Sequence, residues 1–203
     1  MNFSKKRKKK KMPNWCLNTL EIQGPIEDVD KFMEKIKSAE PDKLSLFNAL
    51  IPMPAEYSGE PASVTKEEKD WSDNEKLCFE KYGHKDWYSW CNANWGVKWD
   101  ISDGCITDER LVMKYNFDKK VPEETGEKLV VMQYSTPWGP GDESLAEAFC
   151  RDEYKSLSFH IYYEEGGMGF HGALTVHNGE IVYQESDDMS TIRKCLEDSL
   201  DWI

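Results

Sequence analysis

Trp87-Tyr-Ser-Trp-Cys-Asn-Ala-Asn-Trp-Gly-Val-Lys-Trp-Asp100 is the stretch that most constrains the fold, because it holds four of the eight tryptophans. Trp87, Trp90 and Asn94 recur at spacings of three and four, which places them on one face of a helix. After Gly96 apolar and polar residues alternate, which predicts a strand. An indole ring is large and carries an N–H group that needs a partner when it is buried. We therefore expect a helix, a glycine corner and a strand held together by buried indoles.

The charge of the chain is distributed very unevenly. Seven basic residues and no acidic ones form one run near the N-terminus, made of Lys5, Lys6, Arg7, Lys8, Lys9, Lys10 and Lys11. The rest of the chain has 19 basic and 38 acidic residues, a formal charge of −19. This pattern predicts a disordered basic tail over residues 1–12 and one folded domain over 13–203. The anionic body should repel phosphate backbones.

Length and composition indicate a soluble protein with one well-buried core. The chain has 203 residues, of which 39% are hydrophobic and 12% aromatic. Its six cysteines form no C-x-x-C pair and no secretory signal precedes them, so we expect reduced thiols and a cytoplasmic location. No apolar run reaches the length of a membrane span, and we expect no contact with a membrane.

The hydrophobic pattern of the first half predicts a strand over residues 14–23 and a helix that begins at Pro25. Cys16, Leu20 and Ile22 form one face of that strand. The helix presents an apolar stripe of Val29, Phe32, Met33 and Ile36. A short apolar run at 44–50 completes a first strand–helix–strand unit, and an insertion follows at about 55–96. Asp103-Gly104 is expected to form a tight turn.

The second half predicts strands at 111–117, 129–135 and 157–163, with a charged loop at 118–128 and Asp142 as the N-cap of a helix. Asn178-Gly179 predicts a hairpin between strands at 170–176 and 180–184. An amphipathic helix is expected from residue 186. The alternation of these elements indicates an α+β fold, an antiparallel sheet with helices on one face. A ferredoxin-like sandwich is the natural candidate, with an extra C-terminal hairpin and helix.

Five motifs in order resemble a known family. They are Pro13-Asn-Trp-Cys-Leu-Asn-Thr-Leu20, Ile51-Pro-Met-Pro54, Trp90-Cys-Asn-Ala-Asn-Trp-Gly-Val-Lys-Trp-Asp100, Ser135-Thr-Pro-Trp138 and Tyr163-Glu-Glu-Gly-Gly-Met-Gly-Phe170. Together they resemble the YubB-like ferredoxin-like domain family of phages and conjugative plasmids, over roughly residues 13 to 184. The resemblance implies a ferredoxin-like fold and a mobile-element origin. It supplies no catalytic residues.

Six tryptophans are expected to form a structural aromatic cluster: Trp15, Trp87, Trp90, Trp95, Trp99 and Trp138. The alternative is a platform on which unpaired bases stack, as in single-strand binding proteins. Such grooves interleave aromatic with basic residues, and only Lys98 lies close in sequence. We therefore favour the structural interpretation.

Other candidate sites are weaker. His160 and Tyr162 alternate away from the core face of their strand, and RNA binds such a surface in some ferredoxin-like sheets. Glu164 and Glu165 are candidate contacts with a partner. They lie near His171, but these residues form no compact ligand motif, so we expect no metal and no cofactor. Residues 166–172 resemble a phosphate loop only superficially, because a strand follows them. Cys16 is interpreted as a small buried residue and not as a nucleophile.

These observations favour a non-enzymatic binding protein of a mobile element. A strongly anionic surface imitates the charge of nucleic acid, which suggests a host nucleic-acid-handling or defence protein as the inhibited partner. Asp187 and Asp188 join the two glutamates as candidate contacts. The alternative is a nucleic-acid-binding protein that uses the basic tail and an aromatic sheet face. No motif meets the requirements of an enzyme site, and the oligomeric state is left open.

Overall fold

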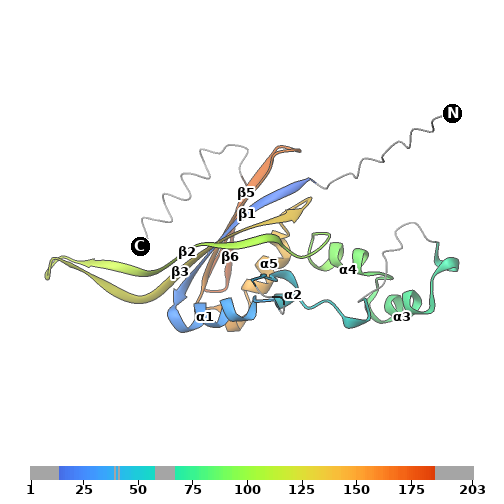
Figure 1. The fold of residues 1–203 in the computed structure, drawn as a ribbon, viewed down its shortest axis with the longest axis horizontal. Coiled ribbons are helices and arrows are strands. Elements are labelled where there is room, and N and C mark those ends of the chain that lie inside the picture. The colour runs from blue at the N-terminus through green and yellow to red at the C-terminus, as the bar shows by residue number, and fades with distance from the viewer. Residues whose placement is uncertain (1–13, 39, 41, 58–66, 186–203) are drawn as a thin grey trace, which may run out of the picture.

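A six-stranded sheet with the strand order β2-β3-β1-β4-β5-β6 forms the centre of the molecule (Figure 1). The computed structural model describes residues 14–38, 40, 42–57 and 67–185. The basic tail, Asp187, Asp188 and the predicted last helix lie outside these residues. The strands are β1 (Trp15–Pro25), β2 (Ser102–Asn116), β3 (Val121–Pro137), β4 (Ser158–Glu165), β5 (Phe170–His177) and β6 (Glu180–Glu185). The helices are α1 (Ile26–Lys35), α2 (Phe47–Leu50), α3 (Asp73–Tyr82), α4 (Trp87–Asn94) and α5 (Asp142–Phe149), with single turns η1 (Ala55–Tyr57), η2 (Glu68–Asp70) and η3 (Asp152–Tyr154).

The connectivity is that of a ferredoxin-like α+β domain, as predicted. All neighbouring strands are antiparallel. The order β1-α1-β2-β3-α5-β4, with β1 between β3 and β4, is the split β-α-β arrangement repeated once. The β5–β6 hairpin extends the sheet beyond β4. Its turn residues Asn178 and Gly179 have φ values of 53° and 76°, which the predicted two-residue hairpin requires.

Helices α1 and α5 pack on the same face of the sheet. Phe159 of β4 stacks on Phe149 of α5 with ring centroids 3.9 Å apart, and it contacts Phe32 of α1 at 5.1 Å. The predicted inward residues of β1 are fully buried on this face. The alternating apolar residues of the strands and the apolar stripe of α1 therefore pack together in one aromatic core. None of the helices in the described part of the chain has the length and apolar character that crossing a membrane requires.

The insertion between α1 and β2 contains α2, α3 and α4. Helix α2 lies beside α5, whereas α3 and α4 lie at one end of the molecule (Figure 1). The apolar run at 44–50 forms α2 and not a strand, so the strand that follows α1 in the sheet is β2. The carboxylate of Asp100 explains this difference. It accepts hydrogen bonds from the Ser45 hydroxyl at 2.6 Å and from the backbone N–H groups of Leu46, Phe47 and Asn48 at 2.9 to 3.1 Å. Asp100 thus caps α2, and β2 begins only at Ser102.

The tryptophans divide into a buried group and a more exposed group. Trp90 and Trp95 are buried with ring centroids 5.5 Å apart, and the Trp95 indole donates to the Ile51 carbonyl at 2.9 Å. Trp87 packs against the same core while partly exposed. Trp15 and Trp99 form a separate half-buried pair, 6.1 Å apart. Trp138 is 52% exposed, so it lies outside the core cluster that the sequence predicts.

Two predicted loops are parts of strands. A short turn occupies residues 117–120, and residues 121–128 belong to β3, which begins at Val121. Asp103-Gly104 lies within β2, where Asp103 has a φ of 54° at a shift of register between Ser102 and Cys105. Residues that favour turns occupy irregularities of a long ribbon here, because a bulge accommodates the same backbone conformations.

Candidate functional site

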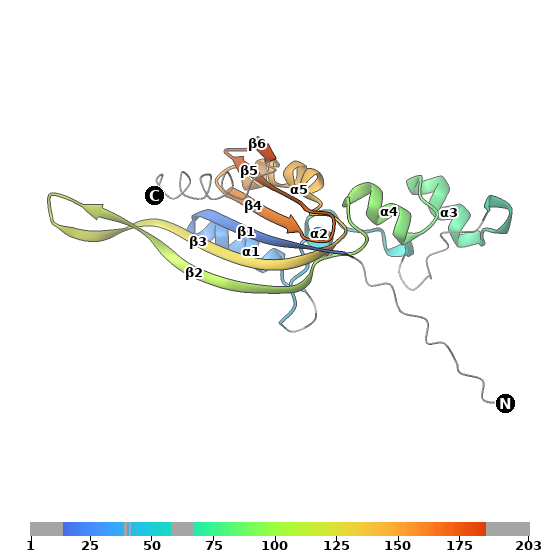
Figure 2. The same ribbon diagram turned by 90° about the horizontal axis from the view of Figure 1, so that it is seen from above.

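Strands β2 and β3 continue beyond the rest of the sheet as a two-stranded ribbon (Figure 1, Figure 2). Strand β3 pairs with β1 only from Glu127 to Pro137, whereas it pairs with β2 from Val121 onward. We call residues 111–126 the arm. An isolated two-stranded ribbon is at best marginally stable in water. Its presence on a well-packed body therefore calls for a functional explanation.

One face of the arm is apolar and open to solvent. Alternate residues of β2 and the following turn form this row: Leu111, Met113, Tyr115 and Phe117 are 40%, 44%, 49% and 82% exposed. Tyr115 lies opposite Pro122, and its ring meets that of Phe117 edge to face at 5.1 Å. A contiguous apolar row of this kind is typical of a surface that contacts another macromolecule. We call these four side chains the apolar row.

The root of the arm is fixed to the body by Lys128. Its Nζ lies 2.7 Å from the Asp30 carboxylate of α1 and also contacts the carboxylate of Glu109 on β2. These hydrogen bonds raise the pKa of Lys128, whose side chain is only 15% exposed. Leu111 is opposite Lys128 in the register. The apolar row therefore lies on the same face of the sheet as α1, but beyond the part of that face that the helix contacts.

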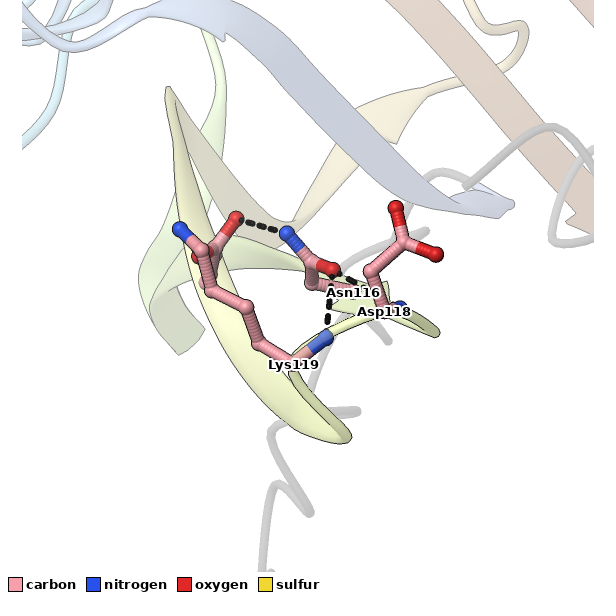
Figure 3. Close-up of polar contacts among 4 residues, drawn as sticks. Asn116, Asp118 and Lys119 are labelled. Carbon is pink, nitrogen blue, oxygen red and sulfur yellow. Dashed lines mark hydrogen bonds and ion pairs between the residues drawn. The ribbon is translucent and has the colours of Figure 1, made fainter.

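The tip of the arm is held by side-chain hydrogen bonds (Figure 3). The side-chain oxygen Oδ1 of Asn116 accepts from the backbone N–H groups of Asp118 and Lys119, at 3.1 and 3.0 Å. The Asn116 amide donates to Glu123 at 2.8 Å, and Lys119 Nζ lies 2.6 Å from the same carboxylate. These bonds lower the pKa of Glu123. The turn that carries Phe117 is thus ordered before any partner binds, which reduces the entropic cost of binding.

A second candidate surface lies on the face of the sheet opposite the helices. It is a shallow hollow of about 440 Å³, lined in part by Leu17, Thr19, Tyr162, Glu164 and Asp103. The charged side chains in its lining are carboxylates. Such a surface repels phosphate groups, and it differs from the basic grooves that bind single strands.

Three of the four predicted contact residues on β4 share this outward face. His160, Tyr162 and Glu164 lie opposite Glu21, Thr19 and Leu17 of β1. Burial is the main cause that lowers the pKa of His160, and nearby His177 adds to it. The His160 Nδ1 atom lies 3.2 Å from the Thr175 hydroxyl.

Glu165 points to the opposite side of β4 and is buried. Its carboxylate accepts from the backbone N–H groups of Gly167, at 2.9 Å, and Met168. Glu165 stabilises the β4–β5 turn. Because its side chain is buried, it cannot contact a partner directly. Residues 166–169 form this turn and strand β5 follows, so the glycines are in a hairpin and not at the start of a helix.

The sequence also raised two other kinds of chemistry, a metal site and a nucleophilic cysteine. Within the described ranges no three His, Cys, Asp or Glu side chains are close enough together to hold a metal ion. Cys16 is fully buried, and burial raises the pKa of its thiol to about 12. The group is therefore a protonated thiol at neutral pH and a poor nucleophile.

The sequence carries only part of the signal that identifies the arm. Alternation over 111–117 predicted a strand, and that strand is confirmed. Alternating apolar residues are usually buried against a core, so the pattern carried no sign that this face is open. The many charged residues at 118–128 indicated a loop, so the sequence did not predict that β3, the second strand of the ribbon, begins at Val121.

The fold and the arm together define a class: a ferredoxin-like α+β domain with a helical insertion at one end and a projecting ribbon at the other. Residues 114–199 match the family described as "Ferredoxin-like domain in Api92-like protein". The crystal structure of api92 from Yersinia pseudotuberculosis is similar, with 11% sequence identity and a TM-score of 0.46 over 86% of this chain and 98% of that chain. No curated protein matches the chain. The family match confirms the ferredoxin-like domain, while the YubB-like label is not confirmed.

Proposed function

We propose that this chain is a non-enzymatic binding protein that engages another protein through the apolar row of the arm. The observation that carries the proposal is the row itself: four large apolar side chains, all at least 40% exposed, on an ordered ribbon. Aromatic and methionine side chains are enriched at the centres of protein interfaces. Tyrosine is also among the residues whose truncation costs most binding energy.

The charge of the arm supports a protein partner over a nucleic acid. Residues 111–126 contain three basic side chains, Lys114, Lys119 and Lys120, and three acidic ones, Asp118, Glu123 and Glu124. A neutral apolar surface gains nothing from the release of counterions that drives binding to a phosphate backbone. The carboxylates in the hollow on the opposite sheet face act against nucleic acid there as well.

The rest of the body adds an electrostatic preference for a cationic partner. Elements α1, α5 and η3 together contain nine acidic and two basic residues. A basic surface on the partner, such as that of a host nucleic-acid-handling or defence protein, would be steered toward this layer. We propose such a host protein as the target, with the apolar row supplying affinity and the acidic layer supplying orientation.

Removing the two aromatic rings of the apolar row tests this proposal. Tyr115→Ser combined with Phe117→Ser should weaken capture of the partner from host lysate by at least about 30-fold, the size of one interface hot spot. Ile181→Ser is the matched control, because Ile181 is an equally exposed apolar residue on β6 at the other edge of the sheet. Binding that survives in the double variant as well as in the control would rule out the arm as the site.

Ionic strength separates the apolar row from charge imitation. The dissociation rate set by the row should change by less than about threefold between 0.1 and 0.5 M salt, because hydrophobic contacts are not screened, whereas steering by the acidic layer acts on the association rate. A complex that depends chiefly on the acidic body should weaken steeply over the same range. Dissociation rates of the captured protein at both salt concentrations measure the difference, and a steep rise of that rate with salt would contradict the assignment to the arm.

A further inference from the structure

We propose that residues 186–203 form an amphipathic helix that folds back over the outward face of β4 and β5, opposite α1 and α5. A segment of this chain, and not another molecule, then occupies that face. The cover forms on the body of the protein and involves neither the arm nor its proposed partner. It also withdraws His160 and Tyr162, two of the residues that the sequence suggested for RNA, from any surface that a base could reach.

The outward side chains of β4 and β5 are shielded from water, although α1 and α5 pack on the other face of the sheet. Ala173 of β5 is 5% exposed, and its outward neighbours His160, Tyr162 and Thr175 are half-buried. Leu17 of β1 lies on the same face and is 53% exposed. The shielding therefore follows β4 and β5 and not the outward face as a whole.

One polar atom on this face lacks a hydrogen bond. Within the described residues, Nε2 of His171 is buried and has no hydrogen-bond partner. His171 lies opposite Glu164 on β4 and directly precedes Gly172, which pairs with Glu185 at the end of β6. A buried polar group without a partner costs free energy. The chain beyond Glu185 starts beside this atom, so it can supply the partner.

The place where the chain leaves the sheet allows it to return across this face. Strand β6 is the edge strand next to β5, and it ends at Glu185. As a helix, residues 186–203 would be about 27 Å long, close to the length of about 26 Å for the eight residues of β4. The stretch that matches the ferredoxin-like domain family runs to residue 199, so it continues past β6 into this segment.

The segment carries an apolar stripe that has to be buried. Its large apolar residues recur at spacings of three and four, on one face of a helix: Met189, Ile192, Leu196, Leu200 and Ile203. A helix with one apolar face packs that face against another element. Helices α1 and α5 already cover the inward face of the sheet. The outward face beside β6 is the adjacent surface that is left for the stripe.

The charges of the segment fit the same placement. Arg193 borders the apolar stripe, whereas the acidic residues Glu197, Asp198 and Asp201 lie on the polar side of the helix. The carboxylates of Glu21 and Glu164 lie on the outward face of β1 and β4. A guanidinium at the edge of the stripe can pair with either of them. The acidic side of the helix would then face solvent, away from these carboxylates.

The reactivity of Cys195 tests the cover in the intact chain, because this thiol borders the stripe. Cys195 should react with a maleimide at least about tenfold more slowly than Cys105, the exposed thiol of β2. Leu196→Asp places a charge in the stripe and should raise the rate at Cys195 at least about tenfold. Lys194→Asp is the control, because it places the same charge on the polar side and should leave Cys195 protected. Mass spectrometry of the labelled peptides measures each rate.

A second pair of variants tests which face the segment covers. Ala173→Asp puts a carboxylate under the proposed cover and should also expose Cys195. Gln133→Asp is its control, because Gln133 is exposed on the same face but lies on β3. Near-ultraviolet circular dichroism checks that the aromatic core is intact in all four variants. A Cys195 that stays protected in folded Ala173→Asp protein, or that is exposed equally by Gln133→Asp, would overturn the placement on β4 and β5.

The dependence on protein concentration distinguishes the chain's own segment from other occupants. A cover within one chain should give the same rate at Cys195 over about a hundredfold range of concentration. Protection that appears only at high concentration would assign the cover to a second copy. A Cys195 that reacts as fast as Cys105 at every concentration would show that the face is open to another partner. Either result would overturn the proposal.

Discussion

Replacing Gly141 by alanine should lower the free energy of unfolding by more than about 3 kcal/mol, because two penalties combine at this position. Gly141 occupies the N-cap of α5, where the sequence had placed Asp142, and its φ of 68° lies in the left-handed region. An added Cβ would lie 2.6 Å from the Phe47 ring and 2.6 Å from the Trp95 carbonyl oxygen. The substitution would weaken the packing of the insertion against α5, because Phe47 belongs to α2 and Trp95 directly follows α4.

Gly126→Ala supplies the control for backbone strain. Gly126 has a φ of 82°, and nothing lies within 4 Å of the position of its Cβ. This substitution should cost only about 1 kcal/mol, the value expected from the left-handed backbone alone. Urea denaturation of both variants measures the difference. Equal losses would show that the space around Gly141 relaxes easily and that the close contact with Phe47 and Trp95 is not a constraint.

Replacing Asp100 by alanine should destabilise the protein by about 3 kcal/mol, since an N-cap is worth about 1 kcal/mol and hydrogen bonds to a charged group about 1.5–3. The carboxylate accepts from Ser45, from three consecutive N–H groups at the start of α2 and from the N–H of Ile101 at 2.8 Å. Removing it leaves these partly buried donors without their acceptor.

The effect of Asp100→Ala should also be local. Amide hydrogen exchange should increase at Leu46, Phe47 and Asn48, while β1 and β4 keep their protection. Asp100→Asn retains one acceptor oxygen and should lie between the original protein and the alanine variant in stability. An asparagine variant as unstable as the alanine variant would assign the effect to charge and not to the geometry of the cap.

The parts of the fold that follow a local period were accessible from the sequence. Alternation in β1, the apolar stripe of α1 and the Asn178-Gly179 turn each depend on residues within a few positions of one another. The α2 cap depends on Asp100, which lies more than fifty residues from Ser45 in the chain. A run of apolar residues followed by Pro52 gives no sign of that contact, so a strand was expected where a short helix forms.

The candidate site shows the same limit. The outward position of His160, Tyr162 and Glu164 follows from their spacing of two along one strand. The same rule places Glu165 on the inner face. Grouping Glu164 and Glu165 only by their shared carboxylate chemistry therefore gave a wrong expectation for Glu165. The exposure of the arm could not be predicted, because it depends on how far along β2 and β3 helix α1 covers the sheet. The contact between Asp30 of α1 and Lys128 of β3 marks the limit of that cover.

Deleting the arm tests the central claim most directly. Residues 112–127, which are the arm without Leu111 and with Glu127, can be replaced by Asn-Gly, so that a two-residue hairpin turn joins the paired residues Leu111 and Lys128. The shortened protein should retain the near-ultraviolet circular dichroism of its aromatic core. Its affinity for the protein captured by the intact chain should fall below detection in a titration at 0.1 M salt. A folded, shortened protein that binds the captured protein as tightly as the intact chain would contradict the account.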